Sequence, residues 1–289
     1  MIRFGPAGNS DSFYAQGYAA TKQQPAWLHQ RGLNALEYSF GRGVRMTEKT
    51  ALEIRTEAEK YDVQLSVHAP YYINMATDDA EKMDNSIRYL VQSGMAARMM
   101  GAKRVVFHPG VTAPDGRAAS VQRIEGLLRR AIDELDAMGL MEDILFCPET
   151  MGKISQIGDL EETLGFCQLD KRLIPCLDFG HLHARSLGAF GSVREDYQRA
   201  LDLLEQALGR ARAQKVHIHF SRIEYTKAGE KRHWTYSDTQ FGPEFWPLAQ
   251  ELAARHYEPV VICESKGTMA EDAKTYQLLY ERAVKEMQL

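Results

Sequence analysis

The sequence contains no apolar run that approaches the roughly 18 residues needed to cross a membrane, and no basic-then-apolar leader at its start. It also lacks the GxGxxG and GxxxxGK[ST] loops that bind nucleotide phosphates. Its four cysteines have no CxxC spacing, and three lie in apolar, strand-like runs, so we expect buried free thiols rather than disulfides or zinc ligands. These absences favour a cytoplasmic protein that does not contact membranes.

The composition is that of an ordinary soluble protein, with 44% hydrophobic and 26% charged residues. The net charge of −4 gives no global reason to expect nucleic-acid binding, although a groove can still be locally basic. The chain has no visible internal repeat and no linker rich in glycine and serine. We therefore expect residues 1–289 to form a single domain.

Short apolar runs alternate with longer stretches of helical period. The predicted strands are Ile2–Gly5, Ala35–Phe40, Gln64–His68, Arg104–His108, Ile144–Glu149, Leu173–Asp178, Lys215–His219 and Pro259–Glu264. The predicted helices are Trp27–Leu33, Thr47–Tyr61, Asp79–Met100, Ala118–Met138, Asp159–Cys167, Val193–Leu208, Glu244–His256 and Met269–Met287. Eight strands alternating with eight helices indicate a (β/α)8 barrel, and a doubly wound open sheet is the alternative.

Six consecutive predicted strands, the third to the eighth, each end in an ionisable residue. These residues are His68, His108, Glu149, Asp178, His219 and Glu264. In a barrel all strand ends of one kind meet at one mouth, where unpaired ionisable groups would be costly to desolvate. Bound cations remove that cost, and a mixture of imidazoles and carboxylates suits Zn²⁺, Mn²⁺ or Fe²⁺ better than Ca²⁺ or Mg²⁺. The sequence therefore predicts a metal cluster.

The remaining histidines fall into separate classes. We expect only one of His217 and His219 to face the barrel interior, and we favour His219 because it ends the strand. His181 follows Asp178 by one loop step and is a further candidate ligand. His233 lies in a long segment after the seventh strand that we expect to be a functional loop, and it is also a candidate ligand. His29 and His256 lie in polar helical contexts and are expected at the surface.

Taken in order, "HAPYYIN", "VFHPG", "PETMG", "CLDFGH", "HIHFS" and "ICES" resemble the endonuclease IV family, the apurinic/apyrimidinic endonucleases among the xylose isomerase-like TIM barrels. The resemblance spans roughly residues 60 to 270. It implies a centre of two or three divalent ions, most readily zinc, and hydrolysis of DNA 5′ to abasic sites, hence a role in DNA repair. No obligate protein partner is implied.

The resemblance also implies a role for each candidate ligand. His68 and His108 bind the first ion, and Glu149 bridges it to the second. The second site is completed by Asp178, His219 and Glu264, and the third contains His181 and His233. Glu149 and Glu264 are then the catalytic residues, Glu264 being both a ligand and a proton acceptor. Tyr71, Tyr72 and Trp234 are candidates to pack against a flipped sugar.

Three features depart from that family. Its third site takes an aspartate two residues before the loop histidine, where this chain has Lys231, with Glu230 beside it. The third site is therefore weak, empty, or rebuilt from Glu230. The family's N-terminal DNA-probing loops are not recognisable, although Arg42 and Arg45 are possible phosphate contacts. The segment from Arg210 to His233 is locally basic, which suits either a phosphate backbone or a solvated face.

Two other function classes use the same strand ends. Glu149, Asp178, His219 and Glu264 alone form the one-metal quartet of sugar isomerases and epimerases, in which the glutamates move a proton next to a carbonyl. A non-enzymatic barrel that keeps its metals as a structural or sensing element is the third class. We favour the endonuclease type, because the HPG on strand four and the DxxH on strand six supply extra imidazoles, which suit additional metal ions.

Overall fold

Eight parallel strands form a barrel, which confirms the fold expected from the sequence. The computed structural model describes residues 1–41 and 43–288, so Arg42 lies outside the described residues. All eight predicted strands are present: β1 (Arg3–Pro6), β2 (Ala35–Ser39), β3 (Gln64–His68), β4 (Arg104–Phe107), β6 (Leu145–Pro148), β8 (Cys176–Asp178), β9 (His217–Phe220) and β12 (Val260–Cys263).

The barrel consists of two four-stranded arcs joined at two seams. Hydrogen-bonded ladders connect β1-β12-β9-β8 in one arc and β2-β3-β4-β6 in the other. Isolated parallel bridges close the circle, from Ala7 to Glu37 at one seam, and from Phe146 to Leu173 and Glu149 to Cys176 at the other. Because every barrel strand is parallel, their carboxyl ends, where the candidate ligands lie, meet at one mouth.

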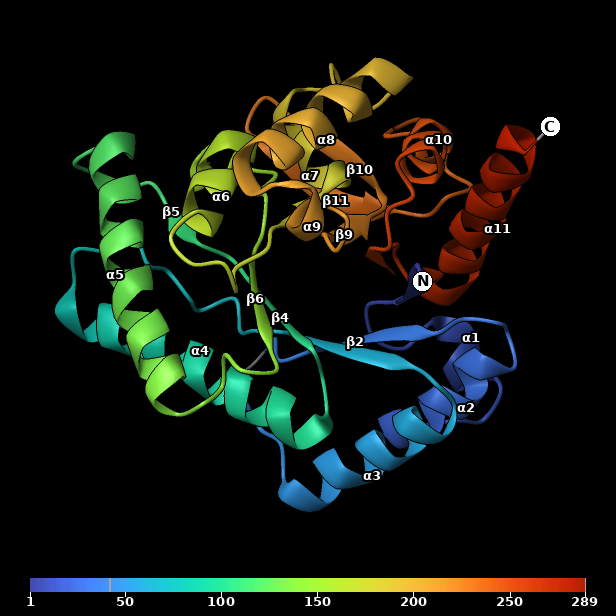
Figure 1. Ribbon diagram of the computed structural model, residues 1–289, viewed down its shortest axis with the longest axis horizontal. Coiled ribbons are helices and arrows are strands. Elements are labelled where there is room, and N and C mark those ends of the chain that lie inside the picture. The colour runs from blue at the N-terminus through green and yellow to red at the C-terminus, as the bar shows by residue number, and fades with distance from the viewer. Residues whose placement is uncertain (42, 289) are drawn as a thin grey trace.

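Helices surround the strands on the outside (Figure 1). They are α1 (Asp11–Ala15), the 3-10 helix η1 (Thr21–Gln23), α2 (Gln24–His29), α3 (Glu48–Lys60), α4 (Ala80–Met100), α5 (Arg117–Ala137), α6 (Leu160–Cys167), α7 (Phe179–Arg185), α8 (Arg194–Leu208), α9 (Arg210–Ala213), α10 (Phe245–Arg255) and α11 (Met269–Met287). Their apolar faces pack on the outward side chains of the strands, such as Phe107 and Ile218, in one continuous core. None of the helices within the described ranges is both long and apolar enough to cross a bilayer.

Local signals in the sequence set several helix ends. The Thr47 side chain accepts a hydrogen bond from the Thr50 backbone N–H at the start of α3. Asp159 forms a capping box with Glu162 at the start of α6. Gly101 ends α4 in the left-handed conformation, with φ of +70°, which glycine adopts without steric cost. These contacts satisfy backbone groups that a helix end leaves free.

The segment that we expected to be an irregular loop after β9 is instead an antiparallel hairpin, β10 (Arg222–Thr226) and β11 (Gly229–Trp234). The second strand begins directly after the turn at Gly229, whose φ is +91°. Two short strands, β5 (Gly110–Val111) and β7 (Gln156–Ile157), pair next to the barrel mouth. The first predicted helix also starts earlier than expected, as α2, and follows α1 and η1, which the sequence analysis did not identify.

Candidate metal centre

Glu149, directly after β6, lies at the centre of the polar mouth of the barrel. Its side chain is buried, and one carboxylate oxygen, Oε2, lies 3.1 Å from the Nε2 atoms of both His68 and His108. The other oxygen, Oε1, lies 3.1 Å from Nδ1 of His219 and 3.4 Å from Nδ1 of His181. One carboxylate thus contacts imidazoles from four segments of the chain, which places it between two sets of donor atoms.

The first set of close donor atoms consists of His68, His108 and Glu149, with one ligand atom of each within 4.8 Å of the others. The two imidazole rings lie 5.0 Å apart at nearly a right angle. Nδ1 of His68 lies 2.8 Å from the carbonyl oxygen of Ala69, which fixes this ring so that Nε2 faces Glu149. Such a backbone partner is typical of histidines that ligate metals.

The second set consists of Glu149, Asp178, His219 and Glu264, again with donor atoms within 4.8 Å of one another. Asp178 also begins α7, and its Oδ1 accepts a hydrogen bond from the His181 backbone N–H at 2.7 Å. Its other oxygen, Oδ2, is buried and has no hydrogen-bond donor among the described residues. A buried carboxylate oxygen without a donor is costly, and a cation in this position would satisfy it.

The third set combines His181, Glu230 and His233. His181 Nε2 lies 3.5 Å from Glu230 Oε2, and His233 Nε2 lies 4.0 Å from Glu230 Oε1. Residues three apart on a regular strand point to opposite faces. In β11, however, Glu224 of β10 pairs with Arg232 whereas Tyr225 pairs with Glu230, which leaves Lys231 as an extra, bulged residue. The bulge brings Glu230 and His233 to the same face.

Lys231 itself is turned away from these donor atoms. Its side chain is about half exposed, and its Nζ lies 2.5 Å from Glu224 Oε1. Glu224 also accepts a hydrogen bond from Arg232 Nε at 2.6 Å. Of the three outcomes expected for the third set, this arrangement favours a set rebuilt from Glu230, because the lysine charge is paired at the surface.

Two glycines allow the hairpin to approach the strand ends. A Cβ atom on Gly152 would lie 2.7 Å from the Glu230 Cβ and 2.9 Å from His181 Cδ2. A Cβ atom on Gly229 would lie 2.2 Å from the Gly152 carbonyl oxygen. The backbone N–H of Glu230 donates to that same carbonyl at 3.0 Å. Glycine at both positions therefore permits the contact that places Glu230 beside His181.

At the barrel mouth, the imidazoles and carboxylates shift one another's pKa values. Burial alone would raise the pKa of Glu149, but the charge of His219 and hydrogen bonds from the surrounding imidazoles hold it well below its usual value. Burial alone would lower the pKa of His181, but the carboxylates of Asp178 and Glu230 raise it to about 10. The pKa of Glu264 is raised, by burial first and also by the nearby Glu149 and Asp178 carboxylates.

The described donor atoms fit divalent cations. They supply imidazole nitrogens and carboxylate oxygens in three sets, and they include a buried oxygen, Asp178 Oδ2, that accepts no hydrogen bond from the described residues. Imidazole and carboxylate together suit zinc, manganese or iron. Cys176 also lies near His217 and His219, and burial raises the pKa of its thiol well above the usual value.

The expectation that only one of His217 and His219 faces inward is wrong. Residues two apart on a strand lie on the same side, and both imidazoles contact Glu37 of β2, which the sequence analysis did not identify. Burial lowers the pKa of His217 to about 4, so this ring is neutral near pH 7. The available sequence signal was a single charged residue, Glu37, inside the apolar run Ala35–Phe40.

A cavity of about 320 Å³ opens above the donor atoms. Besides six of the candidate ligands and Glu230, it is lined by Tyr71, Met151, Lys153 and Gln156. Tyr71 is half exposed, and its ring centre lies 5.3 Å from that of His108. The sequence analysis singled out Tyr71 but not Lys153, the one lysine of this cavity. Of the other two aromatic candidates, Tyr72 packs on Tyr89 and Trp234 donates a hydrogen bond to Glu224.

Other sequence candidates lie outside this mouth. His29 and His256 are exposed, as expected. The basic segment does not form one surface. Arg212 donates to the carbonyl oxygens of Cys167 and Asp170, and the buried Arg222 pairs with Glu244 at 2.9 Å. All four cysteines are free and buried, which confirms that expectation.

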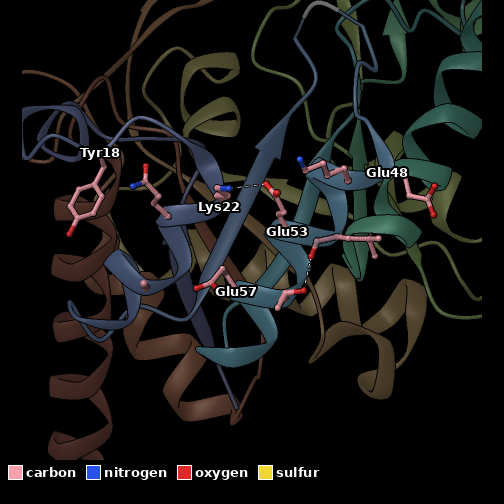
Figure 2. Close-up of a pocket in the computed structure, with 10 residues that line it drawn as sticks. Tyr18, Lys22, Glu48, Glu53 and Glu57 are labelled. Carbon is pink, nitrogen blue, oxygen red and sulfur yellow. Dashed lines mark hydrogen bonds and ion pairs between the residues drawn. The ribbon is translucent and has the colours of Figure 1, made fainter.

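A second and larger cavity, of about 850 Å³, lies between η1 and α3 (Figure 2). Tyr18, Lys22, Glu48, Glu53 and Glu57 are among its lining residues, and Lys22 Nζ pairs with Glu53 Oε2 at 3.0 Å. Both partners are well exposed. Its charged groups therefore already pair with each other or with water, unlike the donor atoms at the barrel mouth.

Comparison with known proteins identifies a family model and related sequences that match most or about half of this chain. The family model described as xylose isomerase-like TIM barrel matches residues 25–281. An uncharacterized protein of Methanocaldococcus jannaschii is 35% identical over 238 residues, which cover 82% of this chain and 84% of that protein. A protein named probable endonuclease 4 from Staphylococcus aureus is 30% identical over 172 residues, and the match spans about half of that protein, 54%.

Solved structures with the same fold fall into more than one functional class. Endonuclease IV from Thermus thermophilus superimposes with a TM-score of 0.72 at 20% identity, covering 98% of this chain and 99% of that one. A D-tagatose 3-epimerase-like protein gives the same TM-score at 15% identity, with 100% of both chains covered. At these identities the likeness establishes the fold alone.

Proposed function

This chain belongs to the xylose isomerase-like TIM barrel family, and we propose that it is a metal-dependent phosphodiester hydrolase of the endonuclease IV type. Its substrate in this proposal is DNA, cut 5′ to an abasic site to leave a 3′-hydroxyl. The cofactor is a centre of two or three divalent ions, most readily zinc. The family's members with named functions, such as endonuclease 4, support the reaction class.

The observation that carries the proposal is that Glu149 joins two sets of donor atoms, while a third set lies beside them. A single-metal sugar isomerase needs only Glu149, Asp178, His219 and Glu264. The additional imidazoles of His68, His108, His181 and His233, together with Glu230, supply donors that such a site does not use. Surplus donors that are buried or partly buried are best explained by additional ions.

When bound, the ions would supply positive charge that stabilises a phosphate under attack and would acidify water. His68 and His108 would hold the first ion with Glu149, and Asp178, His219 and Glu264 would hold the second with Glu149. His181, Glu230 and His233 would hold the third. Glu149 keeps the first two sets in contact, because each of its oxygens faces a different set.

Three residues of the cavity act on the substrate or on the attacking water in this proposal. Glu264 has a raised pKa and a side chain that is 18% exposed, so it reaches the cavity and can accept a proton from water. Lys153 supplies a cation for a phosphate oxygen. Tyr71 offers a ring face at the mouth, on which a sugar that has left the duplex stack can pack.

A duplex that contains one tetrahydrofuran abasic analogue tests the proposal. Metal-loaded protein is expected to nick it 5′ to the analogue, and a chelator should stop the reaction. An intact duplex of the same sequence is the control. If protein with two or three ions per chain leaves the abasic duplex intact, the proposed activity is wrong.

The alternative is a sugar isomerase or epimerase that uses one ion. The observation in its favour is that Glu149, Asp178, His219 and Glu264 by themselves form a compact donor set. This reading predicts one metal ion per chain after purification without chelator, and interconversion of ketoses. A metal count of one with turnover of a ketose would select it over the hydrolase.

A further inference from the structure

Directly below the metal ligands, the barrel interior contains a chain of buried polar side chains to which the proposed reaction assigns no role. They are Glu37 on β2, Ser66 on β3, Arg104 on β4 and His217 on β9, and each is at most 5% exposed. Buried charged groups are kept in protein interiors only when they are paired. Here the contacts run in order from Arg104 through His217 and Glu37 to the candidate ligand His219.

Arg104 lies at the end of this chain of contacts that is farthest from His219, and it fixes which atoms donate and which accept. Its NH1 group lies 3.4 Å from Nδ1 of His217, and because a guanidinium can only donate, this nitrogen of His217 must accept. A neutral His217 then carries its proton on Nε2. That nitrogen lies 3.0 Å from Glu37 Oε2, to which it donates.

Glu37 continues the chain to His219. Its Oε2 accepts hydrogen bonds from His217 and from the Ser66 hydroxyl, which lies 2.8 Å away. Its Oε1 lies 2.9 Å from Nε2 of His219, within ion-pair distance, and neither of these two atoms has a hydrogen-bond partner among the described residues that would compete for it. A carboxylate can only accept, so Glu37 stabilises a proton on Nε2 of His219, and a cation bound at Nδ1 leaves the ring with this proton alone.

The opposite side of the His219 ring faces the donor atoms. Its Nδ1 lies 3.1 Å from Glu149 Oε1 and 3.5 Å from Glu264 Oε1. With the proton on Nε2, Nδ1 keeps its lone pair and points it at the second set of donor atoms. A ligating histidine is generally held in this way by an acceptor on its other nitrogen, which fixes both the ring orientation and the tautomer.

We propose that Glu37 is a positioning residue that fixes His219 as the Nε2-protonated tautomer, so that Nδ1 binds the metal ion of the second set. The inference rests on the proposed metal-dependent function only in requiring that metal binds there. Arg104 and His217 contribute by holding the Glu37 carboxylate with a defined acceptor for each imidazole.

Glu37→Gln is the informative variant, because it keeps the size of the side chain. A glutamine offers one acceptor and one donor, whereas His217 and His219 both donate, so one imidazole must turn or lose its partner. We expect zinc affinity, measured by competition with a chromophoric chelator, to fall about 10- to 100-fold. Glu251→Gln is the matched control. Glu251 is also buried, but it pairs with Arg194 and Arg255, away from the barrel mouth, so this variant should bind zinc like the wild type.

A second measurement reads the tautomer on the wild-type protein and uses a variant only for assignment. Nitrogen-15 spectra of histidine-labelled, zinc-loaded wild-type protein, with His219 assigned by a His219→Gln sample, report which ring nitrogen carries the proton. We expect the proton on Nε2 and zinc on Nδ1. A proton on Nδ1, or equal zinc affinity in Glu37→Gln and Glu251→Gln, would overturn the inference.

These readouts separate the inference from the proposed reaction. If the protein fails to nick abasic DNA but Glu37→Gln still weakens zinc binding, the reaction is wrong and the positioning role stands. If DNA is nicked and Glu37→Gln binds zinc as the control does, the reaction stands and the positioning role is wrong.

Discussion

Glu230 and His233 lie on the same face of β11, with Oε1 and Nε2 4.0 Å apart, although three positions separate them in the sequence. The bulge at Lys231 produces this arrangement. An acidic residue two positions before a histidine on a regular strand gives a similar pair of donors. The structure therefore reaches the geometry of a D-x-H motif with the sequence E-x-x-H.

The first prediction concerns this pair. Glu230→Gln removes the only carboxylate of the third set and should reduce the metal content from three ions per chain to two, measured by elemental analysis. Lys231→Ala should leave the content unchanged, because this side chain pairs with Glu224 at the surface. Loss of an ion in Lys231→Ala, or none in Glu230→Gln, contradicts this account of the hairpin.

The second prediction concerns the glycine beneath the hairpin. In Gly152→Ala the new methyl group would meet Glu230 and His181 at less than 3 Å, so the hairpin must move away. We expect loss of the third ion and a decrease of about 1–3 kcal/mol in the free energy of unfolding. Gly126→Ala in α5 is the control, because no atom lies within 4 Å of its added Cβ, and it should be neutral or slightly stabilising.

The third prediction concerns the shared carboxylate. Glu149→Gln leaves two sets of donors without their common anion, so metal content should fall by at least one ion and activity by more than about 100-fold. Both quantities are measured on the same preparation. Full metal content with wild-type turnover would remove Glu149 from the centre, whereas the loss of both would not choose between the hydrolase and the isomerase.

The fourth prediction follows from the raised pKa of His181. In the metal-free protein this pKa is about 10, above the ordinary value near 6.5, so the folded state binds a proton that the unfolded state has lost. The resulting stability is fully present below pH 6.5 and is lost as the pH rises toward 10. Urea unfolding in chelator should therefore give a free energy lower by more than about 1 kcal/mol at pH 9.5 than at pH 7.

Metal changes the expected pH dependence. A bound cation takes the place of the proton, so the metal-loaded protein should not show this loss of stability between pH 7 and 9.5. His181→Gln in chelator should show a smaller loss than the wild type, since the titrating group is gone. Equal pH dependence in all three samples would contradict the assignment of a raised pKa to His181.

The fifth prediction concerns the thiols. Burial raises the pKa values of Cys147 and Cys263 to about 12, and the reactive form of cysteine is the thiolate. Native protein at pH 8 should therefore release less than one equivalent of thionitrobenzoate from Ellman's reagent within minutes, and protein in urea should release four. Rapid reaction of the native protein would show that its core is open.

The sequence was sufficient to predict the barrel and most of the candidate centre. Alternating periods identified all eight strands, and the last residue of predicted strands three to eight supplied His68, Glu149 and four other candidate ligands. This works because parallel strands have a common polarity, so a local property, the last residue of a strand, fixes a position in space.

What the sequence did not predict depends on register between distant segments. Glu37 and His217 are 180 positions apart, and only the closed barrel brings β2 opposite β9. The hairpin cannot be predicted from the sequence, because its strands are charged and carry a bulge, so they lack an alternating apolar pattern. The role of Glu230 followed from that bulge, which no local pattern indicated.

The candidate centre lies beside one of the two seams of the barrel, so a bound ion would also affect how the two arcs hold together. Isolated bridges join the arcs at both seams, and Glu149 lies beside the seam between β6 and β8, while Asp178, His219 and Glu264 belong to the opposite arc. An ion held by these four residues would join the two arcs across this seam. Loss of the metal would then weaken the contact between β6 and β8, even when no substrate is present.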